Sequence, residues 1–362
     1  MKICSKCILP ESFPMIRFDK NGVCNYCLDY KKIIVKGGDE LEKILNKFRN
    51  QGCDFDCVVG SGGGRDSAYV IHQLVKKYKM RVLMFTYDWG LMTPEAHRNL
   101  ERISKILNIK HVIIRPNAEK IKKHISINIK VWLRRPQLGM IPVFTMADKA
   151  MGVQMNKVAR KYGIKLIVSG TNRYETTHFK TAFCGINETR LGGMTSAQLA
   201  NIDKIKLLFF YFSQYIKNPR YINSSLVEMI KSFFYHYFAN HSKDIIKIFF
   251  YDYIMWDENT VLSIIRKDLN WEAPKDTTMT WRTDDGTAAF YNYICYMVAG
   301  FTENDTFRGN QIRQGILTRE EVFILLKEEN KPRFESIKWY CDTIGIDFES
   351  TIKTINEISK FY

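Results

Sequence analysis

The segment Asp56-Cys57-Val58-Val59-Gly60-Ser61-Gly62-Gly63-Gly64-Arg65-Asp66-Ser67 determines which fold this chain can adopt. A short apolar run leads into a cluster of glycines, and an amphipathic stretch over residues 66–77 follows. This order predicts a buried strand, a tight turn and a helix. Such a turn lets backbone N–H groups close around phosphate oxygens, and the start of the helix adds a favourable dipole. We therefore interpret residues 60–67 as a phosphate-binding loop, with a flexible turn as the alternative.

The loop is neither a Walker loop nor a dinucleotide fingerprint, because G-x4-G-K-[ST] and G-x-G-x-x-G are both absent. Asp66 would stand beside the bound phosphates, which is favourable only when a divalent cation bridges them; we expect Mg2+ there. Arg65 would add positive charge directly. The carboxyl end of a first parallel strand is also where such folds bind ligands.

Short β-branched runs alternate with longer amphipathic runs through the first half of the chain. We expect strands over 56–59, 81–87, 111–115 and 164–169, and helices over 66–77, 94–107 and 146–162. This alternation predicts an α/β fold with a parallel sheet and helices on both faces.

The remaining sequence divides into three predicted domains. Residues 1–37 form a Cys-rich module, 38–200 the nucleotide-binding core, which opens with a helix over 38–50, and 201–362 an aromatic-rich, mainly helical region that binds the acceptor or mediates oligomerisation. Residues 202–256, rich in Lys, Phe and Tyr, predict two or three amphipathic helices that pack into a core or a homodimer seam. A membrane-surface or partner-docking face is the alternative. A capping box at 318–321 predicts a helix through 326.

Composition and charge narrow the class of protein. The 362 residues are 46% hydrophobic and 25% charged, which excludes collagen-like and disordered chains. The net charge of +16 favours polyanionic partners, or it reflects only a solvated surface. The longest uncharged run, 286–302, is shorter than the roughly 20 apolar residues of a transmembrane helix, so we expect a buried helix. With no signal peptide apparent, we expect a cytoplasmic protein with no transmembrane segment.

Four of the nine cysteines stand in two C-x-x-C pairs, Cys4/Cys7 and Cys24/Cys27. Residues 8–23 separate them, within the about 15–20 residues typical of zinc sites. Four thiolates complete a tetrahedral site, so the predicted Zn2+ is structural. A redox pair is the alternative. The other cysteines are scattered.

The glycine loop resembles the S-G-G-x-D-S pyrophosphate loop of the ATP pyrophosphatases, the group that includes GMP, asparagine and NAD synthetases and tRNA-thiolating enzymes. In an alignment on Asp66 and Ser67, Gly62 replaces the motif serine and Ser61 stands one place earlier. Residues 164–169 followed by Gly170-Thr171-Asn172 resemble the later nucleotide loop of the same fold. The resemblance implies an adenine nucleotide alpha-hydrolase-like (PP-loop) core that uses ATP and Mg2+.

Both ends of the chain resemble the N-acetyl sugar amidotransferases of surface-polysaccharide and nonulosonic-acid biosynthesis. The similarity lies in the opening Cys4-Ser-Lys-Cys7-Ile-Leu-Pro, in Gly22-Val-Cys-Asn-Tyr-Cys27 and in residues 311–321. Residues 281–284 depart from the Lys-His-Glu-Ser-like segment of that family. The resemblance implies adenylation of an acetamido carbonyl with release of pyrophosphate, and then displacement of AMP by ammonia. The product would be an acetamidino sugar for lipopolysaccharide, O-antigen, capsule or flagellin glycans.

The resemblance also implies roles for individual residues. Asp66, Arg65 and Ser67 are the expected catalytic residues, with Asp66 as the Mg2+ ligand. The expected ATP and pyrophosphate contacts are Ser61, Gly62, Gly63, Gly64, Arg65, Asp66, Ser67, Tyr87, Asp88, Gly170 and Thr171. The expected acceptor contacts, each of which has a surface position as its alternative, are Arg173, Glu175, Arg282, Asp284 and Arg313.

No glutaminase motif is recognised, so we expect a separate glutamine amidotransferase subunit to supply ammonia. One alternative is a tRNA sulfurtransferase, since that reaction also adenylates a carbonyl and a basic zinc protein suits RNA. It needs a sulfur-carrying cysteine, for which Cys184 is the candidate. No partner cysteine accompanies Cys184, so nucleic acid is not the partner that we expect. A non-catalytic scaffold is a further alternative, which the intact loop with Asp66 disfavours.

Overall fold

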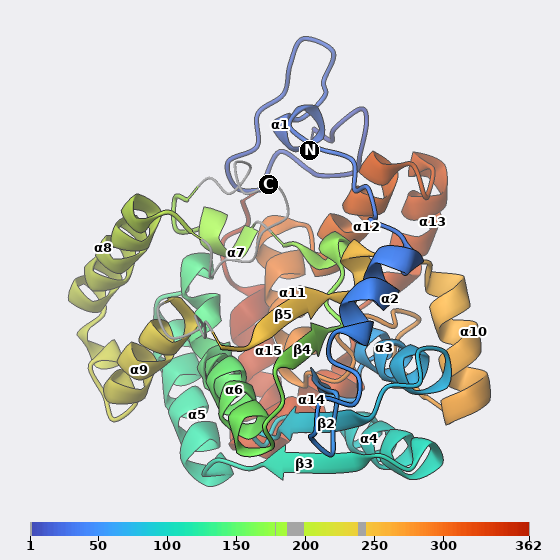
Figure 1. The fold of residues 1–362 in the computed structure, drawn as a ribbon. Coiled ribbons are helices and arrows are strands. Elements are labelled where there is room, and N and C mark those ends of the chain that lie inside the picture. The colour runs from blue at the N-terminus through green and yellow to red at the C-terminus, as the bar shows by residue number, and fades with distance from the viewer. Residues whose placement is uncertain (1, 178, 187–198, 238–243, 362) are drawn as a thin grey trace.

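A five-stranded parallel sheet forms the centre of the computed structural model, which describes residues 2–177, 179–186, 199–237 and 244–361 (Figure 1). The strand order is β3-β2-β1-β4-β5. The strands are β1 (Cys57–Gly60), β2 (Val82–Tyr87), β3 (Lys110–Ile114), β4 (Leu166–Ser169) and β5 (Ile246–Phe249). All neighbouring strands pair in parallel, which confirms the predicted fold class. The chain order reverses at β1, which therefore lies at the topological switch point where α/β sheets bind ligands.

Helices cover both faces of this sheet. One face packs on α3 (Arg65–Lys76) and α4 (Pro94–Leu107), with α10 (Glu258–Leu269) against them. The other face packs on α6 (Met151–Lys161). Adjacent residues of β1 point to opposite sides, because Val58 belongs to the α6 cluster and Val59 to the α3–α4 cluster. Burial on both sides explains the continuous apolar run in the sequence.

Two predicted helices show how local signals set boundaries. The helix predicted over 94–107 is α4, where the Thr93 hydroxyl accepts a hydrogen bond from the Ala96 N–H and Asn108 adopts a left-handed conformation at the end. The helix predicted over 146–162 becomes α-helical only at Met151. The preceding segment, Leu138–Ala150, is a 3-10 helix that contains Pro142, which cannot donate a backbone hydrogen bond.

The C-terminal region is mainly helical, as predicted. Its helices beyond α10 are α11 (Thr287–Ala299), α12 (Glu303–Gln314), α13 (Arg319–Glu329), α14 (Phe334–Ile344) and α15 (Phe348–Asn356). The uncharged run forms the buried α11, and the capping box of Thr318 and Glu321 begins α13. The expectation of helices alone over 202–256 is wrong at β5. There the alternating Ile246-Lys-Ile-Phe segment pairs with β4 and extends the sheet.

The N-terminal module rests on the C-terminal helices (Figure 1). Its only helix among the described residues is the short α1 (Asn25–Leu28), and α2 (Gly38–Asn46) connects it to the core. The guanidinium of Arg319 donates to the carbonyl oxygens of Cys7 and Cys4, at 2.8 and 3.2 Å. Ile8 packs against Val322 and Leu326 of α13. The beginning and the end of the chain are therefore one packed unit.

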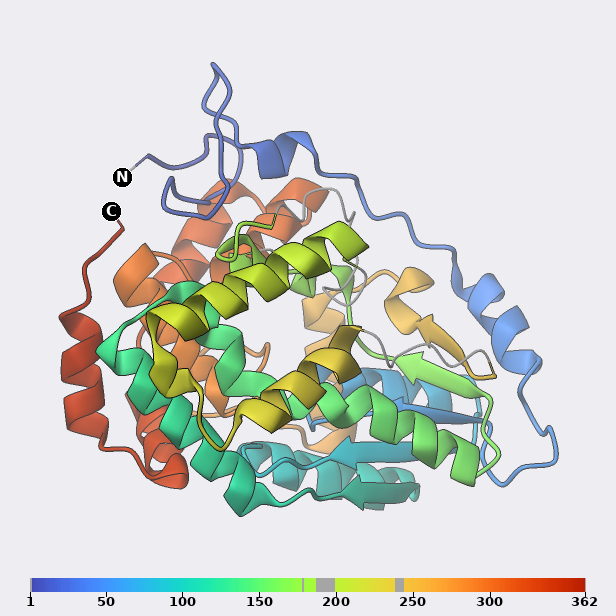
Figure 2. The same ribbon diagram turned by 90° about the vertical axis from the view of Figure 1, so that its left-hand side faces the viewer.

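The aromatic-rich segment forms two helices at one side of the molecule, α8 (Asn201–Lys217) and α9 (Leu226–Tyr237) (Figure 2). Burial of the aromatic rings was expected, yet the Phe209 side chain is 69% exposed and Phe212 and Phe234 are also exposed. Residues 238–243 of this segment lie outside the described residues. None of the described helices is both long and apolar enough to span a membrane.

Candidate active site at the glycine loop

The glycine loop joins β1 to α3, and its first residue is fixed to the neighbouring strand. The Ser61 N–H donates to the Phe85 carbonyl oxygen at 2.9 Å, and the Thr86 hydroxyl donates to the Ser61 carbonyl oxygen at 2.8 Å. The first turn of α3 presents N–H groups without partners inside the helix. The loop is thus a rigid turn that aims backbone donors at the carboxyl edge of the sheet.

Gly63 explains why the middle of the loop must be glycine. Its φ of +83° lies in the left-handed region, and a Cβ there would clash with the Ala96 carbonyl oxygen of α4. Trp271 Nε1 and Asn99 Nδ2 both donate to the Gly63 carbonyl oxygen, at 2.9 and 3.3 Å. Packing against α4 and these two donors hold the loop in one conformation, which argues against a flexible turn.

Ser61, which stands one place earlier than the motif serine, lies beside Ser67. The Ser61 and Ser67 hydroxyl oxygens are 2.8 Å apart, and the Gly63 N–H donates to the Ser61 hydroxyl at 3.1 Å. A Cβ on Gly170 would lie 2.9 Å from Ser67 Cα, so the loop after β4 contacts the start of α3. Thr171 is exposed beside it. The residues predicted to contact pyrophosphate therefore lie together, and their roles stay predictions.

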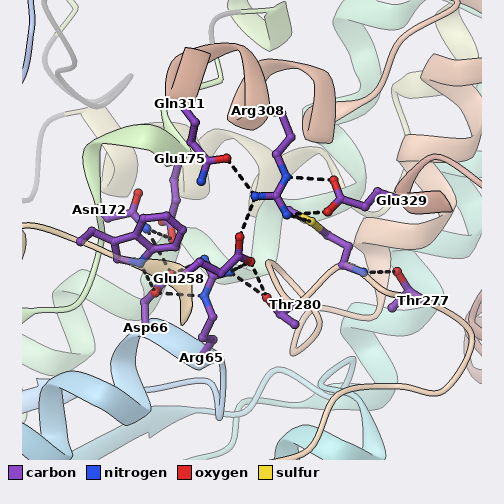
Figure 3. Close-up of polar contacts among 12 residues, drawn as sticks. Arg65, Asp66, Asn172, Glu175, Glu258, Thr277, Thr280, Arg308, Gln311 and Glu329 are labelled. Carbon is purple, nitrogen blue, oxygen red and sulfur yellow. Dashed lines mark hydrogen bonds and ion pairs between the residues drawn. The ribbon is translucent and has the colours of Figure 1, made fainter. Parts of the chain in front are cut away.

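Arg65 and Asp66 lie at the centre of a buried ion network (Figure 3). The Arg65 side chain donates to both Asp66 carboxylate oxygens, at 3.1 and 3.0 Å. Its remaining nitrogen donates to Glu258 Oε1 at 2.7 Å and to Thr280 at 2.8 Å. Arg308 reaches the other oxygen of Glu258 at 2.6 Å. Arg65 is only 2% exposed, so its charge serves this network rather than open solvent.

Asp66 has further donors besides Arg65. Trp256 Nε1 lies 2.7 Å from Oδ1 and Asn172 Nδ2 lies 3.2 Å from Oδ2. Burial alone would raise the pKa of Asp66, but the Arg65 charge and hydrogen bonds from Arg65, Glu175 and Trp256 hold it below its ordinary value. Both oxygens are thus engaged, and the predicted Mg2+ role of Asp66 stays a prediction that requires rearrangement.

Glu175 is a carboxylic acid held close to Asp66. Asn172 Nδ2 donates to Glu175 Oε1 at 3.1 Å (Figure 3). Burial, with the Asp66 charge next in size, raises the pKa of Glu175 well above its ordinary value. This upward shift of the pKa favours the protonated form of Glu175, the form that can act as a proton donor.

Asp284 reaches the glycine loop from a distant part of the chain. A Cβ on Gly62 would clash with its carboxylate, and one on Gly64 would lie 3.0 Å from its Cγ. The Thr93 N–H donates to its carbonyl oxygen at 3.2 Å, which ties the segment to the start of α4. Burial and the neighbouring Asp285 raise the pKa of Asp284 to about 6. The predicted acceptor residue thus faces the predicted phosphate site.

Arg282 belongs to a second buried group near the site. It lies 3.6 Å from Glu303 Oε2 and 3.4 Å from the Tyr291 hydroxyl, while Lys180 Nζ lies 2.6 Å from Glu303 Oε1. Burial would lower the pKa of Arg282, but the charges of Glu303 and Asp285 both raise it. Two carboxylates therefore face the two cations, and an acidic acceptor would share Arg282 and Lys180 with them.

Other predicted residues have partners of their own. Arg173 pairs on the surface with Asp252 at 2.9 Å, and Asp88 pairs with Arg115 at 3.1 Å at the end of β2, beside Tyr87. Arg313 is buried against the cysteine module, where it donates to Cys7 Sγ at 3.5 Å. The expected contact of Arg313 with the acceptor stays a prediction. In this structure its guanidinium contacts the cysteine module.

The four cysteines of the two pairs converge and are buried. All four Sγ atoms lie within 4.8 Å of one another, and the Cys4–Cys27 and Cys7–Cys24 distances are 4.0 and 3.8 Å. Thiols brought this close without disulfides are a metal-binding arrangement.

Several residues of the site were not found by sequence reasoning. They share no local motif, because each contacts the loop, or a residue that does so or lies near it, across the fold: Asn172, Trp256, Glu258, Thr280, Glu303 and Arg308. Only Asn172 had a usable signal, since it directly follows the Gly170-Thr171 loop.

Comparisons with known proteins give distant relatives. No family model matches the chain. It is 26% identical over 115 residues to an uncharacterized protein of Methanocaldococcus jannaschii, covering 31% of this chain and 42% of that protein. It is 25% identical over 171 residues to the tRNA-5-methyluridine(54) 2-sulfurtransferase of Thermotoga maritima, covering 47% and 52%. The chain thus spans about half the length of the curated relatives it matches.

Similar solved structures include the U34-tRNA thiolase NcsA of Methanococcus maripaludis with its 4Fe–4S cluster. That match has 12% identity and a TM-score of 0.34, and covers 99% of this chain and 96% of that one. The NH3-dependent NAD synthetase of Campylobacter jejuni matches at 15% identity and a TM-score of 0.29, covering 57% and 96%.

Proposed function

We propose that this chain is an ATP-dependent amidotransferase that adenylates the acetamido carbonyl of an N-acetyl sugar and replaces its oxygen with nitrogen from ammonia. One observation carries the proposal: a rigid glycine loop at the switch point of a parallel sheet, with its N–H donors and the serine pair of Ser61 and Ser67 facing the nucleotide edge. The sequence resemblance supplies the sugar. Ammonia comes from a separate glutaminase subunit.

The reaction needs charge neutralisation and positioning more than covalent chemistry. The acetamido oxygen attacks the α-phosphorus and pyrophosphate leaves; ammonia then adds to the imidate carbon and AMP departs. The loop N–H groups hold the departing pyrophosphate. Glu175, whose pKa is raised by burial and by the Asp66 charge, serves as the proton donor, and Arg282 and Lys180 bind an acidic sugar. Mg2+ supplies further charge neutralisation when bound.

We propose that the cysteine module holds one structural zinc ion. Four thiolates around a tetrahedral zinc, at Zn–S distances of about 2.3 Å, stand about 3.8 Å apart. The observed 3.8 and 4.0 Å distances fit a single ion. In a 4Fe–4S cluster each cysteine binds a different iron, so the thiolates stand farther apart.

The first prediction concerns the bond that breaks. Purified protein with ATP, ammonium and an accepted sugar should form AMP and pyrophosphate, which chromatography and 31P NMR distinguish from ADP and phosphate. Gly63→Ala should lower the rate by at least about 100-fold, because its Cβ collides with α4 and displaces a loop that must hold charge in the transition state.

Gly345→Ala is the matched control for that variant. Gly345 also has a positive φ, +69°, but nothing lies near an added Cβ. It should cost only about 1 kcal/mol of stability and leave turnover unchanged. ADP formation by the pure protein, or equal activity of the two variants, contradicts the proposed loop.

The second prediction concerns acceptor and nitrogen source. With ATP, Mg2+ and high ammonium, the isolated chain should convert an acidic acetamido sugar from a panel to its acetamidino form, seen by mass spectrometry as exchange of oxygen for an imino nitrogen. Glutamine alone should not replace ammonium. Turnover by the isolated chain with glutamine alone would contradict a separate glutaminase subunit. Absence of product with every sugar of the panel would contradict an acetamido sugar as the acceptor.

A tRNA sulfurtransferase is the second candidate, favoured by the similarity to the Thermotoga maritima enzyme. Burial raises the pKa of Cys295 and of Cys341 to about 12, which keeps these thiols protonated and unreactive. Cys184 is buried, and its thiol donates to the Gly139 carbonyl oxygen. None of these three cysteines is thus an evident sulfur carrier, so the sulfurtransferase has less support than the sugar amidotransferase. Thiolation of unmodified tRNA in the same assay, given a sulfur donor, would favour it.

A further inference from the structure

The Asp284 carboxylate lies where a bound pyrophosphate must lie. It contacts the loop at Gly62 and Gly64, on both sides of the left-handed Gly63. The loop N–H groups and the dipole of α3 attract anions to this place, so the carboxylate and a pyrophosphate compete for it. Their like charges also repel each other unless a cation stands between them.

The backbone around Asp284 holds the side chain in this position. Arg282 adopts a left-handed conformation at φ +50°, which is rare for a residue with a side chain. The hydroxyl of Thr93 donates to the Thr283 carbonyl oxygen at 2.9 Å, and the Gly286 N–H donates to the Leu91 carbonyl oxygen at 2.9 Å. The segment is therefore anchored on both sides of Asp284.

Two carboxylates lie at the loop, those of Asp66 and Asp284, and they differ in the hydrogen bonds that they accept. Both oxygens of Asp66 accept hydrogen bonds from Arg65, Trp256 and Asn172. No hydrogen bond from the side chain of another described residue reaches the Asp284 carboxylate. Mg2+ is usually bound by one or two carboxylates together with substrate phosphates, and Asp284 offers this arrangement without breaking an ion pair.

We propose that Asp284, rather than Asp66, is the residue that holds Mg2+ against the pyrophosphate of ATP, so that nucleotide enters this loop only as its magnesium complex. The inference rests on the proposed function, because it requires the loop to bind ATP. Asp284, predicted from the sequence to contact the acceptor, thus binds the metal at the phosphates instead.

Calorimetric titration with ATP, in Mg2+ and in EDTA, tests the proposal. The wild-type chain should bind ATP at least about tenfold more tightly with Mg2+, because like charges in contact cost affinity. Asp284→Asn should bind metal-free ATP more tightly than the wild type does and should lose most of the Mg2+ dependence. Asp285→Asn, the same change one residue away, should keep the wild-type ratio.

Electron paramagnetic resonance of Mn2+ gives an independent readout. Wild-type protein with ATP should immobilise Mn2+, and Asp284→Asn should not, while its circular dichroism stays that of the wild type. An unchanged Mg2+ ratio, or immobilisation of Mn2+ equal to that of the wild type, in a folded Asp284→Asn overturns the inference alone. A wild-type chain that binds no ATP in either condition overturns the proposed function, and this inference with it.

Discussion

Arg65→Met should destabilise the protein by about 3–5 kcal/mol, which is the usual cost of removing one partner from a buried ion pair. The guanidinium donates to Asp66, Glu258 and Thr280. Methionine leaves the buried Asp66 without its cation, whereas Glu258 keeps Arg308. Urea denaturation followed by circular dichroism measures the loss. The loss of stability is large because a buried carboxylate that has lost its cation is neither solvated by water nor neutralised.

Arg98→Met is the matched control for this experiment. Arg98 also pairs with two carboxylates, Glu95 and Glu272, but its side chain is 47% exposed. Solvent screens those pairs, so the variant should lose less than about 1 kcal/mol. Equal losses for Arg65→Met and Arg98→Met would show that the network at the loop adds little to stability.

Asp66 cannot be removed without a similar consequence. Asp66→Asn weakens the partner of a buried Arg65, so it should destabilise the fold as well as impair activity. In the double variant Arg65→Met/Asp66→Asn the losses should be less than the sum of the single losses, because the two residues share one interaction.

Loss of the cysteine site should have the second large effect. Cys24→Ser should abolish metal retention, and the N-terminal module should unfold, because metal binding supplies about 10–16 kcal/mol to small zinc modules. Metal analysis should fall from about one ion per chain to none, and hydrogen exchange should show lost protection over the module.

The disturbance should also reach the nucleotide site. Arg313, which donates to Cys7 Sγ, also donates to Asn310 Oδ1 at 2.7 Å, and Asn310 holds the Tyr174 carbonyl oxygen at 2.9 Å. We therefore expect faster exchange beside Glu175. Cys53→Ser, at a half-exposed cysteine outside the cluster, should keep both metal and protection. Unchanged exchange in metal-free protein would contradict the coupling.

Local chemistry made part of this molecule predictable. The strand–loop–helix unit around β1, the boundaries of α4 and the box that begins α13 all depend on residues close in sequence, so their patterns can be read directly. The convergence of the cysteine pairs was predictable too, because their C-x-x-C spacing is itself a local pattern.

The rest depends on contacts that no local pattern encodes. Trp256 and Glu258 reach Asp66 and Arg65 from 190 and 193 residues away. Asp284 was predicted as an acceptor contact, whereas its position against the glycine loop depends on the anchoring to Thr93, which is distant in sequence. β5 was missed because its short alternating run follows an aromatic segment that reads as helix.

The support of the cysteine module by α12 and α13 has a consequence for the order of folding. Arg313 and Arg319 are separated from Cys7 by 306 and 312 residues. During synthesis the cysteines emerge first, whereas the helices that cover them emerge near the end. Such long-range contacts form slowly, and domains otherwise fold from the N-terminus onward. The thiols therefore wait for more than 300 residues of synthesis before their arginines emerge, and early capture of the proposed zinc ion would protect them from oxidation during that time.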